Sequence, residues 1–204
     1  PSIHKVFIFG GLAGSRVAPG KYTLRMTLGD VISETEVTIL PNPKVVSSPE
    51  DFIEQQKMLV SIENTVKEMH ESVNQMRSAK TQLSHYTKLL KDSKNADSLI
   101  EKGKELTKRI NSWEENLIQA KQKTFQDVIN FNNKLNAQLI QLKSYVDQAN
   151  PKVTNGAKER FDDLMKDWQV YKNERDTIIN TEMKAYNDLF KALAIPALIL
   201  EEKQ

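Results

Sequence analysis

The stretch SPEDFIEQQKMLVSIENTVKEMHESVNQMRSAKTQLSHYTKLL, residues 48–90, decides the fold of this chain. Its apolar residues recur every seven positions in two series. The first series is Phe52, Leu59, Val66 and Val73, and the second is Ile62, Met69, Met76, Leu83 and Leu90. A heptad pattern sustained over this length predicts one long amphipathic helix. At 1.5 Å per residue, a helix over residues 49–93 would be roughly 60 Å long.

The start of this helix carries several independent signals. Ser48 is a favoured N-cap, and Pro49 suits the first helical position. Glu50 and Asp51 complement the positive end of the helix dipole. We therefore place the start of the helix at residue 49, with its end between residues 92 and 95.

Two further helices follow the same pattern. The second covers residues 96–149, and its apolar stripe shifts phase by about one residue between the part ending at Ala120 and the part resuming at Val128. We expect an irregularity over residues 122–130. After Asn150–Pro151 ends that helix, Thr154 or Asn155 can cap a third one over residues 155–193. Short connections predict antiparallel neighbours. Residues 49–204 are thus expected to form an antiparallel bundle of three long helices.

The N-terminal segment has a different pattern. Five of the seven glycines lie in the first 29 residues, and prolines close the segment. Strands are expected at Lys5–Phe9, Tyr22–Leu28 and Glu34–Leu40, with a hairpin at Gly29–Asp30. The fold class is therefore mainly α, with a small antiparallel β segment over residues 1–43 and a linker over 44–48. Three strands are too few for a sandwich. We expect the missing strands to lie upstream of Pro1, and packing of the strands on the bundle is the alternative.

Composition excludes several classes of function. Charged residues make up 27% of the chain, the net charge is +2, and both signs alternate along the helices. This is typical of a solvated surface and argues against nucleic-acid binding. No apolar run approaches the roughly 18 residues of a membrane span. The absence of cysteine excludes a disulfide framework, a thiolate zinc site and a cysteine nucleophile.

The candidate reactive residues do not form a constellation. The histidines are His4, His70 and His85, and the last two would lie about 22 Å apart on one helix, too far to share a metal. The run FGGLAG, residues 9–14, lacks the order of a dinucleotide fingerprint and no helix follows it. We predict no catalytic, cofactor-binding or metal-binding residue.

We expect structural roles for the adjacent carboxylates and for the tryptophans. The carboxylate pairs are Glu114–Glu115, Asp162–Asp163 and Glu201–Glu202. Neighbours on a helix point about 100° apart, so we expect solvated faces rather than a glycosidase pair. Trp113 and Trp168 fall on apolar stripes and are expected to pack in the core, with a sugar platform as the alternative. The abundant amides are expected to fix register or face water; they include Asn132, Asn133, Asn136, Gln138 and Gln141.

The apolar tail, residues 192–200, should be covered by other atoms. We expect it to dock against the end of the bundle or the β segment; the alternative is a missing part of a parent protein. The chain opens at Pro1 rather than at methionine, so we expect it to be a fragment of a longer polypeptide.

The segment RVAPGKYTLRMTLGDVISETEVTIL, residues 16–40, resembles the closing strands of a bacterial immunoglobulin-like module. The match is carried by Val17, Pro19, Gly20, Tyr22 and Thr23. The β segment is thus expected to be a partial immunoglobulin-like domain.

The sequence of the expected helices is similar to the C-terminal region of bacterial sortilin-like, BNR-repeat β-propeller proteins, often labelled glycosyl hydrolases. The matching stretches are VNQMRSAKTQL (73–83), KLNAQL (134–139) and IPAL (195–198). The resemblance implies that a propeller, with any hydrolytic or binding site, lies upstream. It also implies a secreted, periplasmic or cell-surface location.

These observations lead to one functional expectation and two alternatives. We expect a non-catalytic C-terminal accessory or interaction module of such a parent, whose partner is the upstream propeller or another protein. One alternative is a self-contained helical adaptor or oligomerisation module, which would form a homo-oligomer. The other is an enzyme such as a glycosidase. No cofactor and no membrane span are expected.

Overall fold

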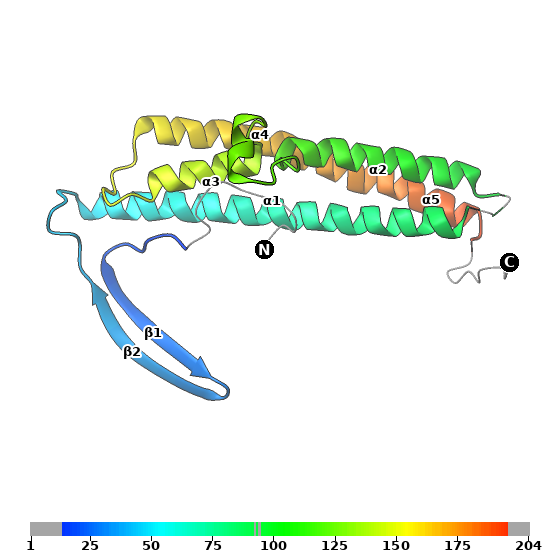
Figure 1. Cartoon of the computed structure of the whole chain (residues 1–204). Coiled ribbons are helices and arrows are strands. Elements are labelled where there is room, and N and C mark those ends of the chain that lie inside the picture. The colour runs from blue at the N-terminus through cyan, green and yellow to red at the C-terminus, as the bar shows by residue number, and fades with distance from the viewer. Residues whose placement is uncertain (1–13, 92, 94, 196–204) are drawn as a thin grey trace.

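The computed structural model describes residues 14–91, 93 and 95–195. Helix α1 (Pro49–Leu89) forms a spine along the molecule. Helices α2 (Asp97–Leu117) and α3 (Leu135–Val146) run back along it, and α4 (Asn155–Thr177) returns in the direction of α1 (Figure 1). A π turn, Ile178–Met183, joins α4 without interruption to α5 (Lys184–Ala192). The helices thus form three antiparallel rods: α1, then α2 with α3, then α4 with α5. The predicted antiparallel bundle is therefore confirmed.

The cap predicted for the first helix is present. The Ser48 hydroxyl accepts a hydrogen bond from the Asp51 N–H at 3.3 Å, and an Asp51 carboxylate oxygen accepts one from the Ser48 N–H at 2.9 Å. This reciprocal capping box satisfies two groups that a helix start leaves without partners. The helix ends at Leu89, four residues before the predicted end at residue 93.

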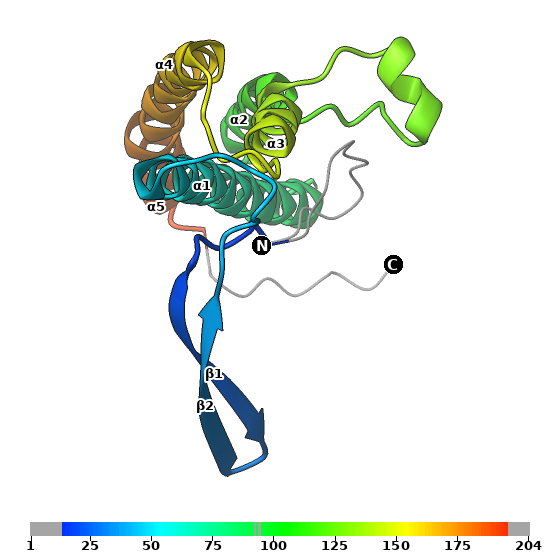
Figure 2. The same cartoon turned by 90° about the vertical axis from the view of Figure 1, so that its left-hand side faces the viewer.

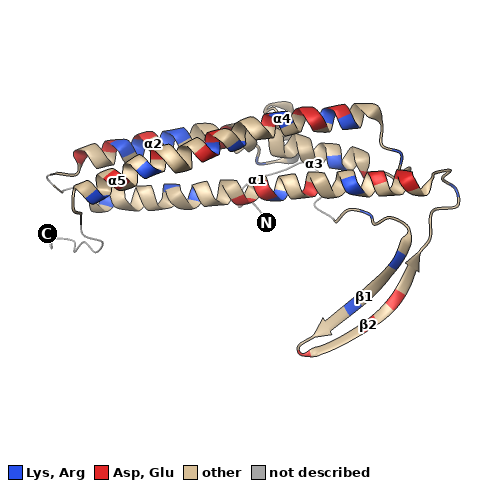
Figure 3. Cartoon of the chain, turned by 180° about the vertical axis from the view of Figure 1, so that it is seen from behind, with Lys and Arg blue, Asp and Glu red and all other residues tan. Residues whose placement is uncertain are grey.

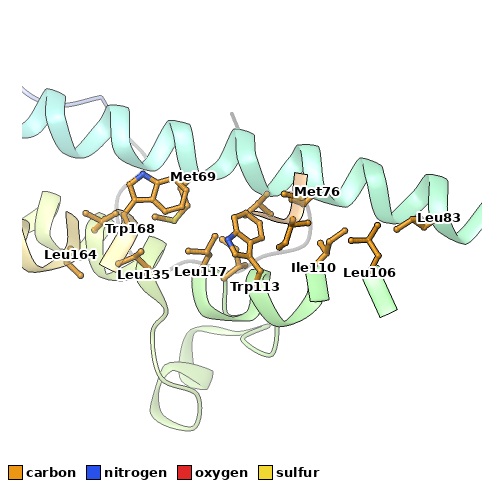
Figure 4. Close-up of a cluster of buried hydrophobic side chains, with 14 of the residues drawn as sticks. Met69, Met76, Leu83, Leu106, Ile110, Trp113, Leu117, Leu135, Leu164 and Trp168 are labelled. Carbon is orange, nitrogen blue, oxygen red and sulfur yellow. The ribbon is translucent and has the colours of Figure 1, made fainter. Parts of the chain in front are cut away.

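The core lies between the three rods and follows the predicted stripes (Figure 4). Seven of the nine heptad positions between residues 52 and 90 are buried, and Phe52 and Val66 are partly exposed. The largest fully buried side chains are Trp113 on α2 and Trp168 on α4. Periodic burial of this kind is what makes the long helices stable, because helix propensity alone contributes little.

The middle rod is interrupted over a longer stretch than expected. Helix α2 ends at Leu117 and α3 begins at Leu135, so the predicted resumption of the stripe at Val128 is wrong. Val128 instead lies in a short 3₁₀ helix, η1 (Phe125–Ile129), at the tip of a loop that projects from the bundle (Figure 2).

Side-chain amides close the neck of this loop. Gln119 donates to the Asn132 carbonyl at 3.0 Å, and the buried Gln122 donates to the Phe131 carbonyl at 2.7 Å. Gln138 donates to the Asn133 carbonyl at 3.0 Å. Some of the abundant amide side chains therefore hold this loop through hydrogen bonds. The spacing of apolar residues in the sequence does not predict such bonds.

The third rod begins as predicted. Thr154 is the N-cap, and its hydroxyl accepts a hydrogen bond from the Ala157 N–H at 3.2 Å. The helix continues through the π turn to Ala192, close to the predicted end at residue 193. Arg109 of α2 lies 3.3 Å from Glu174, which precedes this turn, and 3.5 Å from Glu182, which lies within it.

The described β structure is one antiparallel hairpin, β1 (Gly20–Leu28) and β2 (Val31–Ile39). Gly29 has φ +58°, while Asp30 has no positive φ, as in a type II′ turn. The predicted hairpin at Gly29–Asp30 is confirmed, although β2 begins three residues before Glu34. The strand expected at Lys5–Phe9 lies outside the described residues. The hairpin projects from the N-terminal end of α1 (Figure 1).

Candidate functional site

Several of the sequence candidates lie outside the described residues. They are His4, residues 9–13 of the FGGLAG run, residues 196–200 of the apolar tail and the Glu201–Glu202 pair. The described beginning of the tail packs on the bundle, because Leu193 and Ile195 contact the core.

The two described histidines have different surroundings on α1. His70 is buried, whereas His85 is exposed and lies edge-on to the Tyr86 ring with centroids 6.2 Å apart. Within residues 14–91, 93 and 95–195, no group of three or more His, Asp or Glu side chains is placed to hold a metal ion.

The adjacent carboxylates separate into two kinds. Asp162, Asp163 and Glu115 are exposed, as expected for solvated faces. The expectation is wrong for Glu114, which is buried against α1. One of its oxygens lies 2.6 Å from an Arg77 guanidinium nitrogen, and the other accepts a hydrogen bond from Lys80 at 2.8 Å. Two cations one helical turn apart on α1 thus compensate one buried carboxylate.

Acid is expected to weaken the bundle as the pH falls below about 4.5. Burial alone would raise the pKa of Glu114, but hydrogen bonds and charges from Arg77 and Lys80 outweigh it and hold the pKa below its usual 4.5. A carboxyl with a lowered folded-state pKa contributes stability that is present above the unfolded pKa and lost as the pH falls through the folded pKa. Urea midpoints at pH 7 and pH 3 measure this loss. Glu114→Gln should reduce the difference between them, and an unchanged difference would contradict this role.

The two tryptophans are core residues. Both are 0% exposed, and each indole N–H has a partner. Trp113 donates to the Tyr171 carbonyl at 2.8 Å, and Trp168 donates to the Glu68 carboxylate at 3.1 Å. Neither ring presents a free face to solvent, so the structure favours core packing over the alternative of a sugar platform.

A pocket of about 410 Å³ lies between the end of α3 and the start of α4. Leu142, Val146 and Val153 line its apolar part, and Lys152 and Arg160 contribute its charged groups. The described lining holds no carboxylate, histidine or serine.

The hairpin β1–β2 is the most unusual surface of the molecule. Residues directly opposite each other in the register share a face of the sheet. One side, which we call the apolar face, consists of Gly20, Tyr22, Leu24, Met26, Leu28, Val31, Ser33, Thr35, Val37 and Ile39. The other side, the polar face, consists of Lys21, Thr23, Arg25, Thr27, Ile32, Glu34, Glu36 and Thr38.

The outer half of the apolar face is open to solvent. Leu24, Met26, Leu28 and Val31 are 57%, 69%, 78% and 69% exposed. Neighbouring exposed apolar side chains of this size are typical of interaction surfaces. The bundle therefore leaves this part of the face uncovered.

The base of the hairpin is tied to the bundle. The Arg16 N–H donates to Asp147 at 3.3 Å, and the Ser15 hydroxyl donates to Glu63 at 2.6 Å. Glu63 also lies 2.8 Å from Lys143. The hairpin is therefore attached at its base while its tip extends away from the helices.

No described helix is long and apolar enough to cross a membrane. No family model, curated protein or solved structure matches the chain.

Proposed function

We propose that this chain is a non-catalytic interaction module, acting as a C-terminal accessory part of a larger secreted protein of the sortilin-like, BNR-repeat β-propeller type. The interaction role rests on the exposed outer half of the apolar face. The identity and location of the larger protein rest on the resemblance of residues 16–40 and of the helical stretches alone.

The bundle and the hairpin differ in how far they bury their apolar side chains, and this difference supports the role. The bundle has a closed core in which both tryptophans are fully buried. The hairpin leaves large apolar side chains exposed, although burying one such side chain is worth about 1.5–3 kcal/mol. A rigid scaffold that presents an apolar surface is the arrangement expected of a binding element.

The proposal is tested with the complete coding sequence. We expect repeated four-stranded blades to be encoded upstream of Pro1, and the upstream part, expressed separately, to co-elute with this chain in size-exclusion chromatography. The variant Leu24→Thr/Met26→Thr/Leu28→Thr should lose co-elution, because threonine keeps a high strand propensity but removes the apolar surface. A coding sequence that starts close to Pro1 would contradict the larger-protein proposal, and turnover of aryl glycosides by the purified chain would contradict the non-catalytic role.

The accessibility of the apolar face gives a separate prediction. The triple variant is expected to reduce the fluorescence of bound 8-anilinonaphthalene-1-sulfonate by at least about half, because the dye binds exposed apolar surface. Ile32→Thr is the control, since Ile32 is 60% exposed on the polar face. Thermal unfolding followed by circular dichroism should be unchanged in both variants. Equal fluorescence loss in the control would show that the dye does not distinguish the two faces.

A helical adaptor or oligomerisation module is the second candidate. Ile53 and Val60 lie seven residues apart on α1 and are 50% and 46% exposed. They could pair with another helix, but a coiled-coil seam normally extends over three or four heptads. Light scattering that shows a stable dimer or trimer, lost on Ile53→Ser/Val60→Ser, would favour this candidate.

A further inference from the structure

An isolated two-stranded hairpin is at best marginally stable in water. Strands β1 and β2 each have nine residues, so the hairpin is roughly 30 Å long. Stable sheets have three or more strands with one face covered. In the described part of the chain the sheet has only these two strands, which leaves both outer edges open. The hairpin thus has the form of an incomplete sheet.

The two edges differ in charge. On the polar face, β1 carries Lys21 and Arg25, whereas β2 carries Glu34 and Glu36, as the blue and red bands in Figure 3 show. Arg25 and Glu34 pair across the hairpin. Lys21 and Glu36 have no ion pair with the described residues, so one edge presents a cation and the other an anion.

This charge pattern disfavours a symmetric dimer through the edges. A two-fold axis would place β1 beside β1 or β2 beside β2, and like charges on neighbouring strands are destabilising. Pairing β1 of one copy with β2 of the next is compatible in charge, but such a head-to-tail contact generally does not close into a dimer.

The area of the hairpin also argues against a second copy. One face of two strands of this length covers roughly 300 Å². A stable interface buries about 800 Å² on each partner. Two apolar faces stacked on each other would therefore fall well short. A larger sheet that both covers the face and pairs with the edges would bury more of the hairpin than a stacked second copy does.

We infer that the hairpin is completed by a β-sheet of another polypeptide segment, one that covers Leu24, Met26, Leu28 and Val31 with apolar side chains. Its strand beside β1 carries acidic side chains on the polar face, and any strand beside β2 carries basic ones. This inference rests on the proposed interaction function and specifies its partner.

The test is site-specific photo-cross-linking in the complete polypeptide, expressed in its source cells. The probe p-benzoylphenylalanine is placed at Met26 on the apolar face or at Ile32 on the polar face, which are 69% and 60% exposed. Cross-linked peptides are identified by mass spectrometry, with mixed heavy and light isotopes to recognise a second copy. We expect a strong product from position 26, in a segment with alternating apolar residues, and at least about five-fold less product from position 32.

The charge of the β1 edge is tested in the same assay. Lys21→Glu should lower the yield from position 26 at least about three-fold, whereas Lys57→Glu, at an exposed position on α1, should leave it unchanged. Equal effects of the two substitutions would overturn the assignment of an acidic strand beside β1.

The remaining outcomes separate this inference from the proposed function. A product that joins two copies of the hairpin, or one that joins Met26 to a helical segment, overturns the β-sheet partner but keeps an interaction module. Equal yields from positions 26 and 32 also overturn it. No product from either position overturns both the inference and the proposed interaction role.

Discussion

Replacing Trp113 with alanine is expected to lower the free energy of unfolding by about 4 kcal/mol. Trp113 is fully buried on α2 and lies close to Ile110 and Leu117 on the side facing Met76 of α1 (Figure 4). The substitution removes a large side chain from a close-packed interior and leaves a cavity. It also removes the hydrogen bond to the Tyr171 carbonyl, which links α2 to α4.

Urea unfolding followed by circular dichroism measures this effect. The matched variant Trp113→Phe keeps an aromatic ring but lacks the indole N–H, so it should cost less, about 2 kcal/mol, through lost volume and the lost hydrogen bond. An alanine variant that loses less than about 1 kcal/mol would contradict the burial of this side chain between the rods.

Removal of the Glu114 carboxylate is expected to have the second-largest effect, about 2–3 kcal/mol for Glu114→Ala. Arg77 and Lys80 are mostly buried, with 27% and 22% of their side chains exposed. Without Glu114 their charges lose the carboxylate that compensates them. Breaking a fully buried pair costs about 3–5 kcal/mol, and residual contact with water reduces that value here.

The adjacent Glu115 provides the control for this prediction. It is exposed on the same helix, and Glu115→Ala should change the free energy of unfolding by no more than about 0.5 kcal/mol. The two variants are compared by urea unfolding at pH 7. Equal effects would show that helix propensity, not the buried cluster, determines the result.

The long helices could be predicted because burial on a helix is periodic. Heptad positions such as Leu59 and Met76 face the core, and the Ser48 cap depends on residues three positions apart. Both signals are local in sequence. The hairpin turn at Gly29–Asp30 was predictable for the same reason.

Features that depend on distant residues could not be predicted. Glu114 looked like one of two solvated carboxylates until the fold brought it to Arg77 and Lys80, more than thirty residues earlier. The projecting loop depends on amide bonds such as that from Gln122 to the Phe131 carbonyl, which leave no periodic trace. The exposure of Met26 likewise depends on what the bundle does not cover.

The length of α1 separates the two ends of the molecule by a fixed distance. The hairpin leaves the bundle near the first turn of α1, whereas α5, which ends at Ala192, lies beside the last turns of α1 (Figure 1). A helix of 41 residues spans roughly 60 Å. Because two other rods brace it, this helix resists bending. A domain held by the hairpin is therefore kept several nanometres away from whatever lies beside Ala192.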